Sequence, residues 1–327
     1  MSEVVSDIRP RPGAATGPSV PAQETDGLVL RIGDLFAISV PTLFGLAIVS
    51  SYRNVPDWAP VSAALFGVAL LGLASRFWAS KSDHPIAQLV GNFYIMLTIW
   101  VLYSRLNPMI DLVSPVPYDR DLQAIDQWLF GVQPSVWLEQ FHHPWLTEIA
   151  YICYLAFFFW QLALGILLYL RKNNDFADYM LRVVMFYMLS YIVYIMVPAI
   201  GPRFDLAPEY TRPMEGVYFA EAIRQTFIDI PMYRDCFPSG HTGLTLLVLL
   251  TAYQKRAFKF FAFMFPFAMI LIFSTVYCRF HYVVDLLCAL PFVTGVAFLQ
   301  RSLELAMPHG IVVPLPHKIM VKDRVGA

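Results

Sequence analysis

The sequence has little charge and few cysteines. Asp, Glu, Lys and Arg make up 14% of its 327 residues, whereas they make up about 25% of an ordinary soluble domain. Four cysteines in a chain of this length do not form the disulfide framework of a small secreted protein. The formal net charge is −1 and no basic run occurs, so the composition argues against a nucleic-acid partner.

Apolar residues are abundant instead. Hydrophobic residues make up 57% of the chain and aromatic residues 15%, which is typical of a membrane helix bundle with aromatic side chains at its interfaces. Residues 1–30 are the exception, because they are rich in Pro, Ala, Gly, Ser and acids up to about Asp26. We expect a disordered N-terminal tail here, and not a signal peptide, since the segment lacks an apolar core.

Eight apolar stretches follow the tail, each close to the length of about 20 residues that crosses a hydrocarbon core, although the sixth is short. They predict an all-α, polytopic membrane helix bundle of about eight transmembrane helices, forming one membrane-embedded domain over residues 31–300. Residues 301–327 are expected to be a cytoplasmic C-terminal tail. The predicted spans are Leu35–Tyr52, Pro60–Trp78, Ile86–Leu106, Trp145–Leu170, Tyr179–Ile200, His241–Tyr253, Phe258–Cys278 and His281–Gln300.

The short loops between these stretches predict the orientation, because Lys and Arg collect on the cytoplasmic side. The second, fourth and sixth loops are basic, which places them and both termini in the cytoplasm. The third, fifth and seventh loops then face the periplasm, another extracytoplasmic space or an organelle lumen. The basic residues are Arg76, Lys81, Arg171, Lys172, Lys255, Arg256 and Lys259.

Two short segments on the predicted outer face carry chemistry. The first, Cys236–Thr242, precedes the sixth span, where Ser239 can cap the helix and Gly240 lets backbone N–H groups approach an anion. In the second, His281 and Asp285 are four residues apart, so on a helix they lie on one face. An Asp that accepts a hydrogen bond from one ring nitrogen leaves the other nitrogen free to act as a nucleophile or base.

The order and spacing of these segments resemble a known family. Pro238-Ser239-Gly240-His241, followed forty residues later by His281-x-x-x-Asp285, resembles the motifs of the type-2 phosphatidic acid phosphatase superfamily. The resemblance covers about the last half of the chain. Ile125–Gly131 and Val197–Arg203 are similar to its inositolphosphotransferase branch, which is related to fungal inositol phosphorylceramide synthases.

The resemblance implies a role for each motif residue. His281 would be the nucleophile that forms a phosphohistidine, and Asp285 would orient it. His241 would protonate the leaving oxygen and later activate the acceptor, while Ser239 and the Gly240 N–H would help to hold the phosphate. We expect neither a metal nor another cofactor.

The expected phosphate-binding arginines depart from the family pattern. Asp205 stands where the first family motif has Lys, and Thr275 stands where the third has Arg. Guanidinium groups grip phosphate oxygens with two parallel hydrogen bonds, so nearby arginines are the natural replacements. The predicted set is Arg203, Arg279 and Arg234.

Several functions fit this pattern. The leading one is transfer of a phospho-headgroup, such as inositol phosphate, from a phospholipid or polyprenyl phosphate to a lipid alcohol. With water as the acceptor, the same site is a lipid phosphatase. A non-catalytic protein that binds or transports lipid phosphates is the alternative from another class. Two histidines and a carboxylate can also form an iron-binding triad, and soluble vanadium haloperoxidases have a similar site, but the arginines and the membrane spans favour a lipid phosphate.

Cys236 and Cys278 lie just before the two histidines, on the same predicted face. In an oxidising compartment a disulfide could join the two motif loops. Connectivity does not follow from sequence, and the interpretation that we favour is two unpaired thiols.

Overall fold

The predicted all-α membrane bundle is confirmed. The computed structural model describes residues 27–171, 174–228, 234–307 and 311–314, so most of the predicted N-terminal tail lies outside the described residues. The long helices are α1 (Ile32–Ser50), α2 (Trp58–Lys81), α3 (Pro85–Tyr103), α7 (Pro144–Leu155), α8 (Phe157–Leu170), α9 (Asp175–Met196), α12 (Gly240–Gln254), α13 (Phe258–Tyr277) and α14 (Val283–Ala306). Two short strands, β1 (Gly27–Leu30) and β2 (Ile311–Pro314), pair antiparallel beside the bundle.

Every predicted span forms a helix, but not all of them have the length of a membrane span. Six described helices are long and apolar enough to cross a membrane, and α7 and α8, bent by 42° at their junction, form a seventh if they are taken as one span. The sixth predicted span is α12 (Gly240–Gln254), whose 15 residues reach only about 22 Å, against about 30 Å of hydrocarbon. The chain is therefore a multi-pass membrane protein in which α12 is shorter than the bilayer core.

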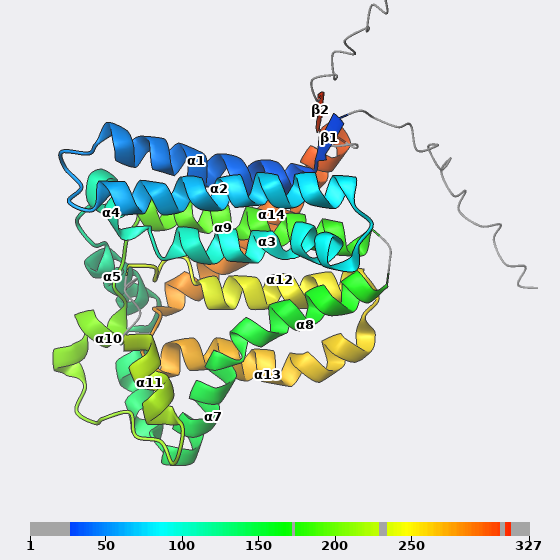
Figure 1. Cartoon of the computed structure of the whole chain (residues 1–327). Coiled ribbons are helices and arrows are strands. Elements are labelled where there is room, and N and C mark those ends of the chain that lie inside the picture. Colours follow the sequence, from blue (N-terminus) through cyan, green and yellow to red (C-terminus); the bar gives the residue numbers. More distant parts are fainter. Residues whose placement is uncertain (1–26, 172–173, 229–233, 308–310, 315–327) are drawn as a thin grey trace, which may run out of the picture.

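Successive long helices run in opposite directions when α7 and α8 are taken as one bent span, so the loops gather at two ends of the bundle (Figure 1). One end, the terminal end, carries β1, β2 and the last turn of α14. The other, the motif end, carries the loops before α12 and α14 together with all the short helices. These are α4 (Asn107–Val113), α5 (Asp119–Phe130), α6 (Pro134–Trp137), η1 (Leu138–Phe141), α10 (Pro202–Asp205), η2 (Ala207–Glu209) and α11 (Ala220–Ile228).

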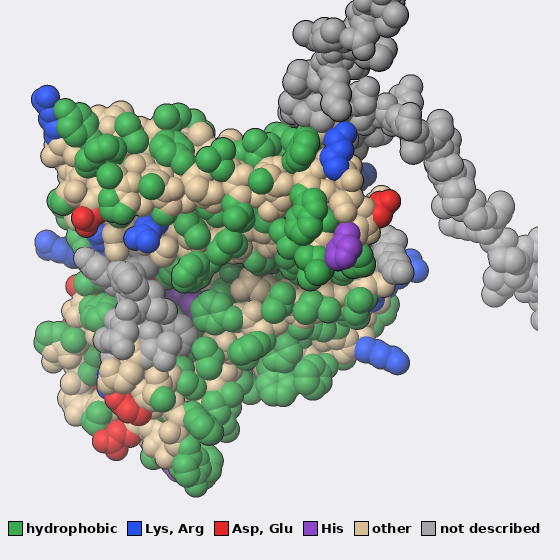
Figure 2. Space-filling view, viewed as in Figure 1, with side chains coloured by type: hydrophobic (Ala, Val, Ile, Leu, Met, Phe, Trp, Pro, Cys, Tyr) green, Lys and Arg blue, Asp and Glu red, His purple; other side chains and the backbone are tan. Residues whose placement is uncertain are grey.

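Helix α9 is the centre of the bundle. Its most apolar window is 72% buried, whereas those of the other five long apolar helices are at most 44% buried, and it contacts α1, α3, α8, α12 and α14. The outer helices expose apolar side chains such as Leu70, Trp100 and Phe298. In Figure 2 hydrophobic side chains cover the middle of the molecule, and charged ones gather near its two ends. This surface suits lipid in the middle and water at both ends.

Charged residues inside the bundle have partners. Arg182 on α9 donates to the side-chain oxygens of Gln300 at 2.7 Å and Thr251 at 2.9 Å. Arg76, predicted as a loop cation, lies instead inside the bundle, 3.0 Å from an oxygen of Asp34. Both cations therefore contact polar or acidic side chains of other helices inside the bundle.

Candidate active site

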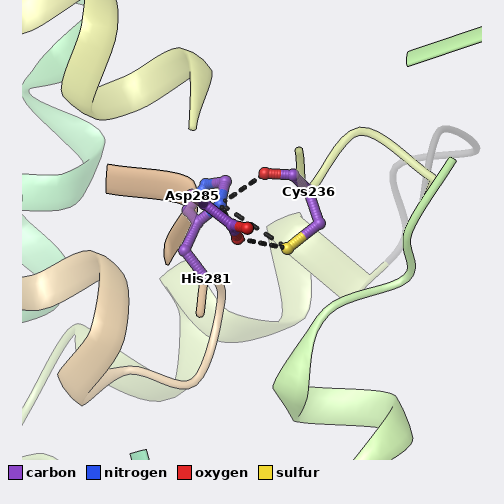
Figure 3. Close-up of side chains that lie close together, drawn as sticks. All are labelled: Cys236, His281 and Asp285. Atoms are coloured by element: carbon purple, nitrogen blue, oxygen red, sulfur yellow. Dashed lines mark hydrogen bonds and ion pairs between the residues drawn. The ribbon is translucent and has the colours of Figure 1, made fainter. Parts of the chain in front are cut away.

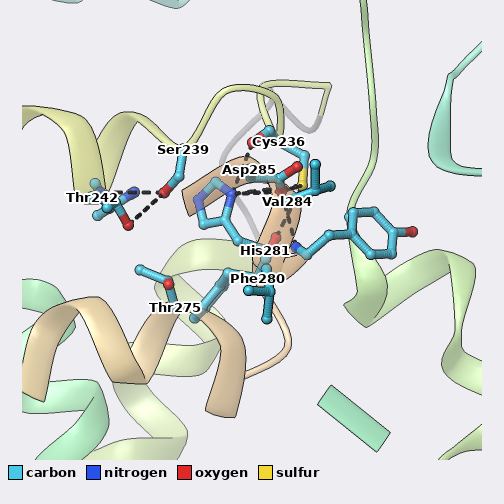
Figure 4. Close-up of polar contacts among 12 residues, drawn as sticks. Cys236, Ser239, Thr242, Thr275, Phe280, His281, Val284 and Asp285 are labelled. Carbon is cyan, nitrogen blue, oxygen red and sulfur yellow. Dashed lines mark hydrogen bonds and ion pairs between the residues drawn. The ribbon is translucent and has the colours of Figure 1, made fainter. Parts of the chain in front are cut away.

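The start of α12 is built around Ser239 and Gly240. The Ser239 hydroxyl accepts a hydrogen bond from the Thr242 N–H at 3.2 Å (Figure 4), so it caps the helix as predicted. A Cβ at Gly240 would lie 2.6 Å from the Tyr194 hydroxyl, so any larger residue would require the Tyr194 side chain to shift. This cap places His241 in the first turn of α12.

The turn before α14 positions His281. The backbone N–H groups of Phe280 and His281 both donate to the Thr275 carbonyl at 2.9 Å, and Arg279 adopts a left-handed conformation with φ of 67°. His281 therefore precedes the α14 N-cap, Tyr282, rather than lying on the helix itself. Its contact with Asp285, expected from a helical spacing, is made across the first turn.

His281 and Asp285 are in contact at this turn, as predicted. The His281 Nδ1 lies 3.2 Å from the Asp285 Oδ2 and 2.8 Å from the Cys236 carbonyl oxygen (Figure 3). Both neighbours are acceptors, so they favour the tautomer that has its proton on Nδ1. That tautomer leaves the lone pair on Nε2, the nitrogen needed for nucleophilic attack.

Cys236 completes this cluster. Its Sγ lies 2.9 Å from the Asp285 Oδ2 and 3.6 Å from the His281 Nδ1. Burial, and then the neighbouring Asp285, raises the pKa of the Cys236 thiol, so the thiol stays protonated and donates to the carboxylate. Cys236 and Cys278 are both free thiols in the structure.

His241 faces the same region from α12. Its ring stacks on Tyr154 at 4.1 Å and packs against Phe157 at 4.2 Å, and its Nδ1 lies 3.2 Å from the Tyr154 hydroxyl. The centroids of the His241 and His281 rings are 6.1 Å apart. Within the described part of the chain, the buried His241 Nε2 has no hydrogen-bond partner, so it is the nitrogen left for a ligand.

A cavity of about 320 Å³ lies between the two histidines and the bundle interior. It has a polar end and a larger apolar part, as a lipid with a charged headgroup requires. The polar end is lined by Arg203, Asp235, Cys236, Gly240, His241 and His281.

Only one of the three predicted phosphate-binding arginines lines this cavity. Arg203 does so, with its guanidinium packed over the rings of Phe204 at 4.6 Å and Phe280 at 5.0 Å. Arg279 instead stacks on Tyr210 at 3.7 Å and donates to the Arg212 carbonyl. The structure thus brings Arg203 to the two histidines and leaves Arg279 outside the cavity.

The third arginine is also engaged elsewhere. Arg234 is buried and forms an ion pair with Asp111 at 2.7 Å. Its guanidinium also donates to the side-chain oxygen of Asn107 at 3.2 Å. These contacts join α4 to the loop that leads into the first motif, so Arg234 supports the site by holding this loop against α4.

Acidic side chains at the motif end hold the site loops through backbone N–H groups, a role that the sequence did not reveal. Asp119 accepts from the N–H groups of Ile200 and Gly201 at 2.9 and 2.8 Å. Glu148 accepts from four successive N–H groups at the start of α11, over residues 217–220. Burial raises the pKa of the Asp119 carboxyl, although these N–H groups oppose the shift.

Asp126 holds the helix that bears Asp285. Its two oxygens accept from the N–H groups of Val283 and Val284 at 2.8 and 2.9 Å, the first amides of α14. A carboxylate at a helix N-terminus satisfies unpaired amides and the positive end of the helix dipole. These contacts give Asp126 a structural role at the start of α14.

Replacing Asp126 with Ala is expected to lower the free energy of unfolding by about 2 kcal/mol, because one buried and one half-buried N–H group lose a charged acceptor. Thermal unfolding in detergent, followed by circular dichroism, measures the change. Asp121→Ala is the matched control, since Asp121 lies exposed on the same helix. Equal midpoints for both variants would contradict the structural role.

Cys236, His281 and Asp285 also have the chemistry of a metal site. One ligand atom from each lies within 4.8 Å of the others. The three atoms are already hydrogen-bonded to one another, and His241, which the iron-triad alternative requires, is not among them. The iron triad of two histidines and one carboxylate is therefore not the arrangement that these side chains form.

These features define a polytopic membrane protein with a histidine–carboxylate site at one end of an amphipathic cavity. The sequence profile of the PAP2 superfamily matches residues 120–299, more than half of the 327 residues, and the chain belongs to this superfamily. Membership supports a phosphatase-type enzyme that acts on lipid phosphates in a membrane. Comparison with curated proteins and with solved structures gives no match, so the inositolphosphotransferase branch stays a prediction.

Proposed function

We propose that this protein is a lipid phosphoesterase that works through a phosphohistidine and transfers a phospho-headgroup, of the inositol phosphate kind, to a lipid alcohol. The observation that carries the proposal is the cavity that His241, His281 and Arg203 share. Its polar end suits a phosphate, and its apolar part suits the chain of a lipid.

In the first step, the His281 Nε2 attacks phosphorus and the bond to the leaving oxygen breaks. His241, as an imidazolium, gives that oxygen its proton. Asp285 accepts the hydrogen bond from Nδ1 and stabilises the positive charge that develops on His281. In the second step, His241 takes a proton from the acceptor, whose oxygen attacks phosphorus, and the bond from phosphorus to Nε2 breaks.

Positive groups around the phosphate stabilise the charge in both steps. We assign direct contact to Arg203 and to the N–H groups at the start of α12, including that of Gly240, with Ser239 fixing their direction. Arg279 and Arg234 act indirectly, through the loops that they hold. We also propose that the motif end faces the extracytoplasmic side, since the loops with Lys255, Arg256 and Lys259 lie at the terminal end.

The test compares purified wild type with His281→Ala in detergent. Both are incubated with a panel of lipid phosphates, with ceramide and diacylglycerol as acceptors, and the products are measured by mass spectrometry. A transferred headgroup made only by wild type supports the proposal. Free phosphate made only by wild type supports the second candidate, a lipid phosphatase, which superfamily membership favours. Identical profiles would contradict both.

The two histidines are expected to produce a bell-shaped dependence of kcat/KM on pH. The rate falls at low pH because His281 must be neutral to attack, and it falls at high pH because His241 must be protonated to donate. Initial rates between about pH 5 and pH 9 measure this profile. His241→Gln should lose the fall at high pH, and a flat wild-type profile would rule out these roles.

A further inference from the structure

The cavity has a polar strip that the proposed chemistry does not use. Tyr187, Tyr191 and Tyr194 line it from one face of α9, as their spacing of four and three residues requires. The Tyr187 hydroxyl donates to the side-chain oxygen of Gln161 at 3.1 Å. From Tyr194 to Tyr187 the strip covers about 10 Å of helix, so polar groups continue well past the histidines.

Part of the cavity wall is apolar and reaches the exposed surface of the bundle. Trp100 on α3 and Phe158 and Leu162 on α8 line the cavity, and their side chains are 66%, 47% and 42% exposed. Exposed apolar side chains in the middle of a membrane bundle contact lipid. A lipid alcohol can therefore place its chain along this wall while its polar end lies near the histidines.

Asp235 is an unexpected residue at the polar end. Its Oδ2 accepts a hydrogen bond from the Tyr103 hydroxyl at 2.6 Å, and in the described part of the chain it forms no ion pair. Its backbone is fixed beside Ala199 by a bridge and by the hydrogen bond from the Cys236 N–H. A carboxylate in a phosphate-binding cavity repels the phosphate, so it needs a ligand that donates hydrogen bonds.

We propose that Asp235, held by Tyr103, binds a second hydrogen-bond donor of the acceptor lipid, a hydroxyl or amide N–H next to the reacting hydroxyl. This inference rests on the proposed function and names the acceptor class: a lipid alcohol with two neighbouring donors. The reacting hydroxyl donates its proton to His241 and its oxygen attacks phosphorus. The bond from phosphorus to the His281 Nε2 then breaks, while the second donor stays on Asp235.

The test uses p-nitrophenyl phosphate as donor, because its leaving group needs no proton. A long-chain 1,2-diol and the primary alcohol of equal length compete as acceptors, and mass spectrometry measures each alkyl phosphate and inorganic phosphate. Wild type should favour the diol about 10-fold to 100-fold in kcat/KM, the size expected of one hydrogen bond to a charged group. Asp235→Asn should reduce this preference to about 1, whereas Asp121→Asn, a substitution at an exposed residue of the motif end, should keep it.

Tyr103→Phe provides a second test, because it keeps the carboxylate and removes only the group that fixes it. We expect the preference for the diol to decrease by about 3-fold to 10-fold, which is a smaller decrease than in Asp235→Asn. No preference in wild type, or a preference retained in Asp235→Asn, would overturn the inference. Release of inorganic phosphate alone would also overturn it, yet would leave the phosphoesterase intact. If His281→Ala gives the same products as wild type, the proposed function itself fails.

Discussion

Replacement of His281 by Gln is expected to reduce kcat by about four orders of magnitude or more. Loss of a catalytic nucleophile removes the covalent route, and only binding and electrostatic effects remain. Gln keeps a polar side chain of similar size in the buried site, where His281 is 4% exposed, so the fold should be retained. Phosphate release and thermal unfolding, measured on the same preparation, separate loss of chemistry from loss of structure.

The matched variant is His241→Gln, because the two histidines have different roles in the two steps. With p-nitrophenyl phosphate, the first step needs no proton from His241, but the second step loses its base. Phosphoenzyme should therefore accumulate in His241→Gln and be absent from His281→Gln. Intact-protein mass spectrometry after rapid quenching detects the added phosphoryl group. Equal labelling of the two variants would exclude His281 as the nucleophile.

Asp285→Asn is expected to have the second largest effect, a fall in kcat of about three to four orders of magnitude. The carboxylate oxygen 3.2 Å from Nδ1 holds the proton there together with the Cys236 carbonyl oxygen at 2.8 Å. An amide can present its N–H₂ group instead, which favours the other tautomer and puts the proton on Nε2, where attack is blocked. The corresponding substitution in the Ser-His-Asp triad lowers kcat by about 10⁴.

Two measurements define the origin of the effect in Asp285→Asn. Phosphoenzyme formation with p-nitrophenyl phosphate should slow by the same factor as kcat, since the first step needs the free Nε2. The unfolding midpoint also has to be compared, because Asp285 accepts from the Tyr282 N–H at 2.9 Å as well. A kcat within about tenfold of wild type would show that Asp285 only shapes the turn.

The bundle and the central residue pair could be predicted from sequence because both depend on local patterns. Apolar runs near span length are contiguous, so each predicted span forms a helix. His281 and Asp285 are close in sequence, and their contact holds even though His281 precedes the helix. The short α12 was recognisable by the same rule, since its apolar run is only about three-quarters of a span length.

The rest of the site depends on contacts between distant segments. Tyr154 lies inside an apolar run, and no local pattern distinguishes it from a packing residue, yet it stacks on His241. Arg279 was predicted to bind phosphate from its position near His281, but the left-handed turn directs it to Tyr210. Asp235 directly precedes the first motif, but its contacts with Ala199 and Tyr103 join segments that are distant in sequence.

The Asp126 contacts have a consequence for biosynthesis. Asp126 and the amides that it holds are separated by 157 and 158 residues, and α14 follows all the other described long helices in the chain. Before α14 is synthesised, the nascent chain lacks the hydrogen bonds of Asp126 to Val283 and Val284. It also lacks the site residues that α14 and its preceding turn contribute. A product that terminates before α14 would lack Asp285 and the two amides that Asp126 holds, so the site can form only after α14 has been synthesised.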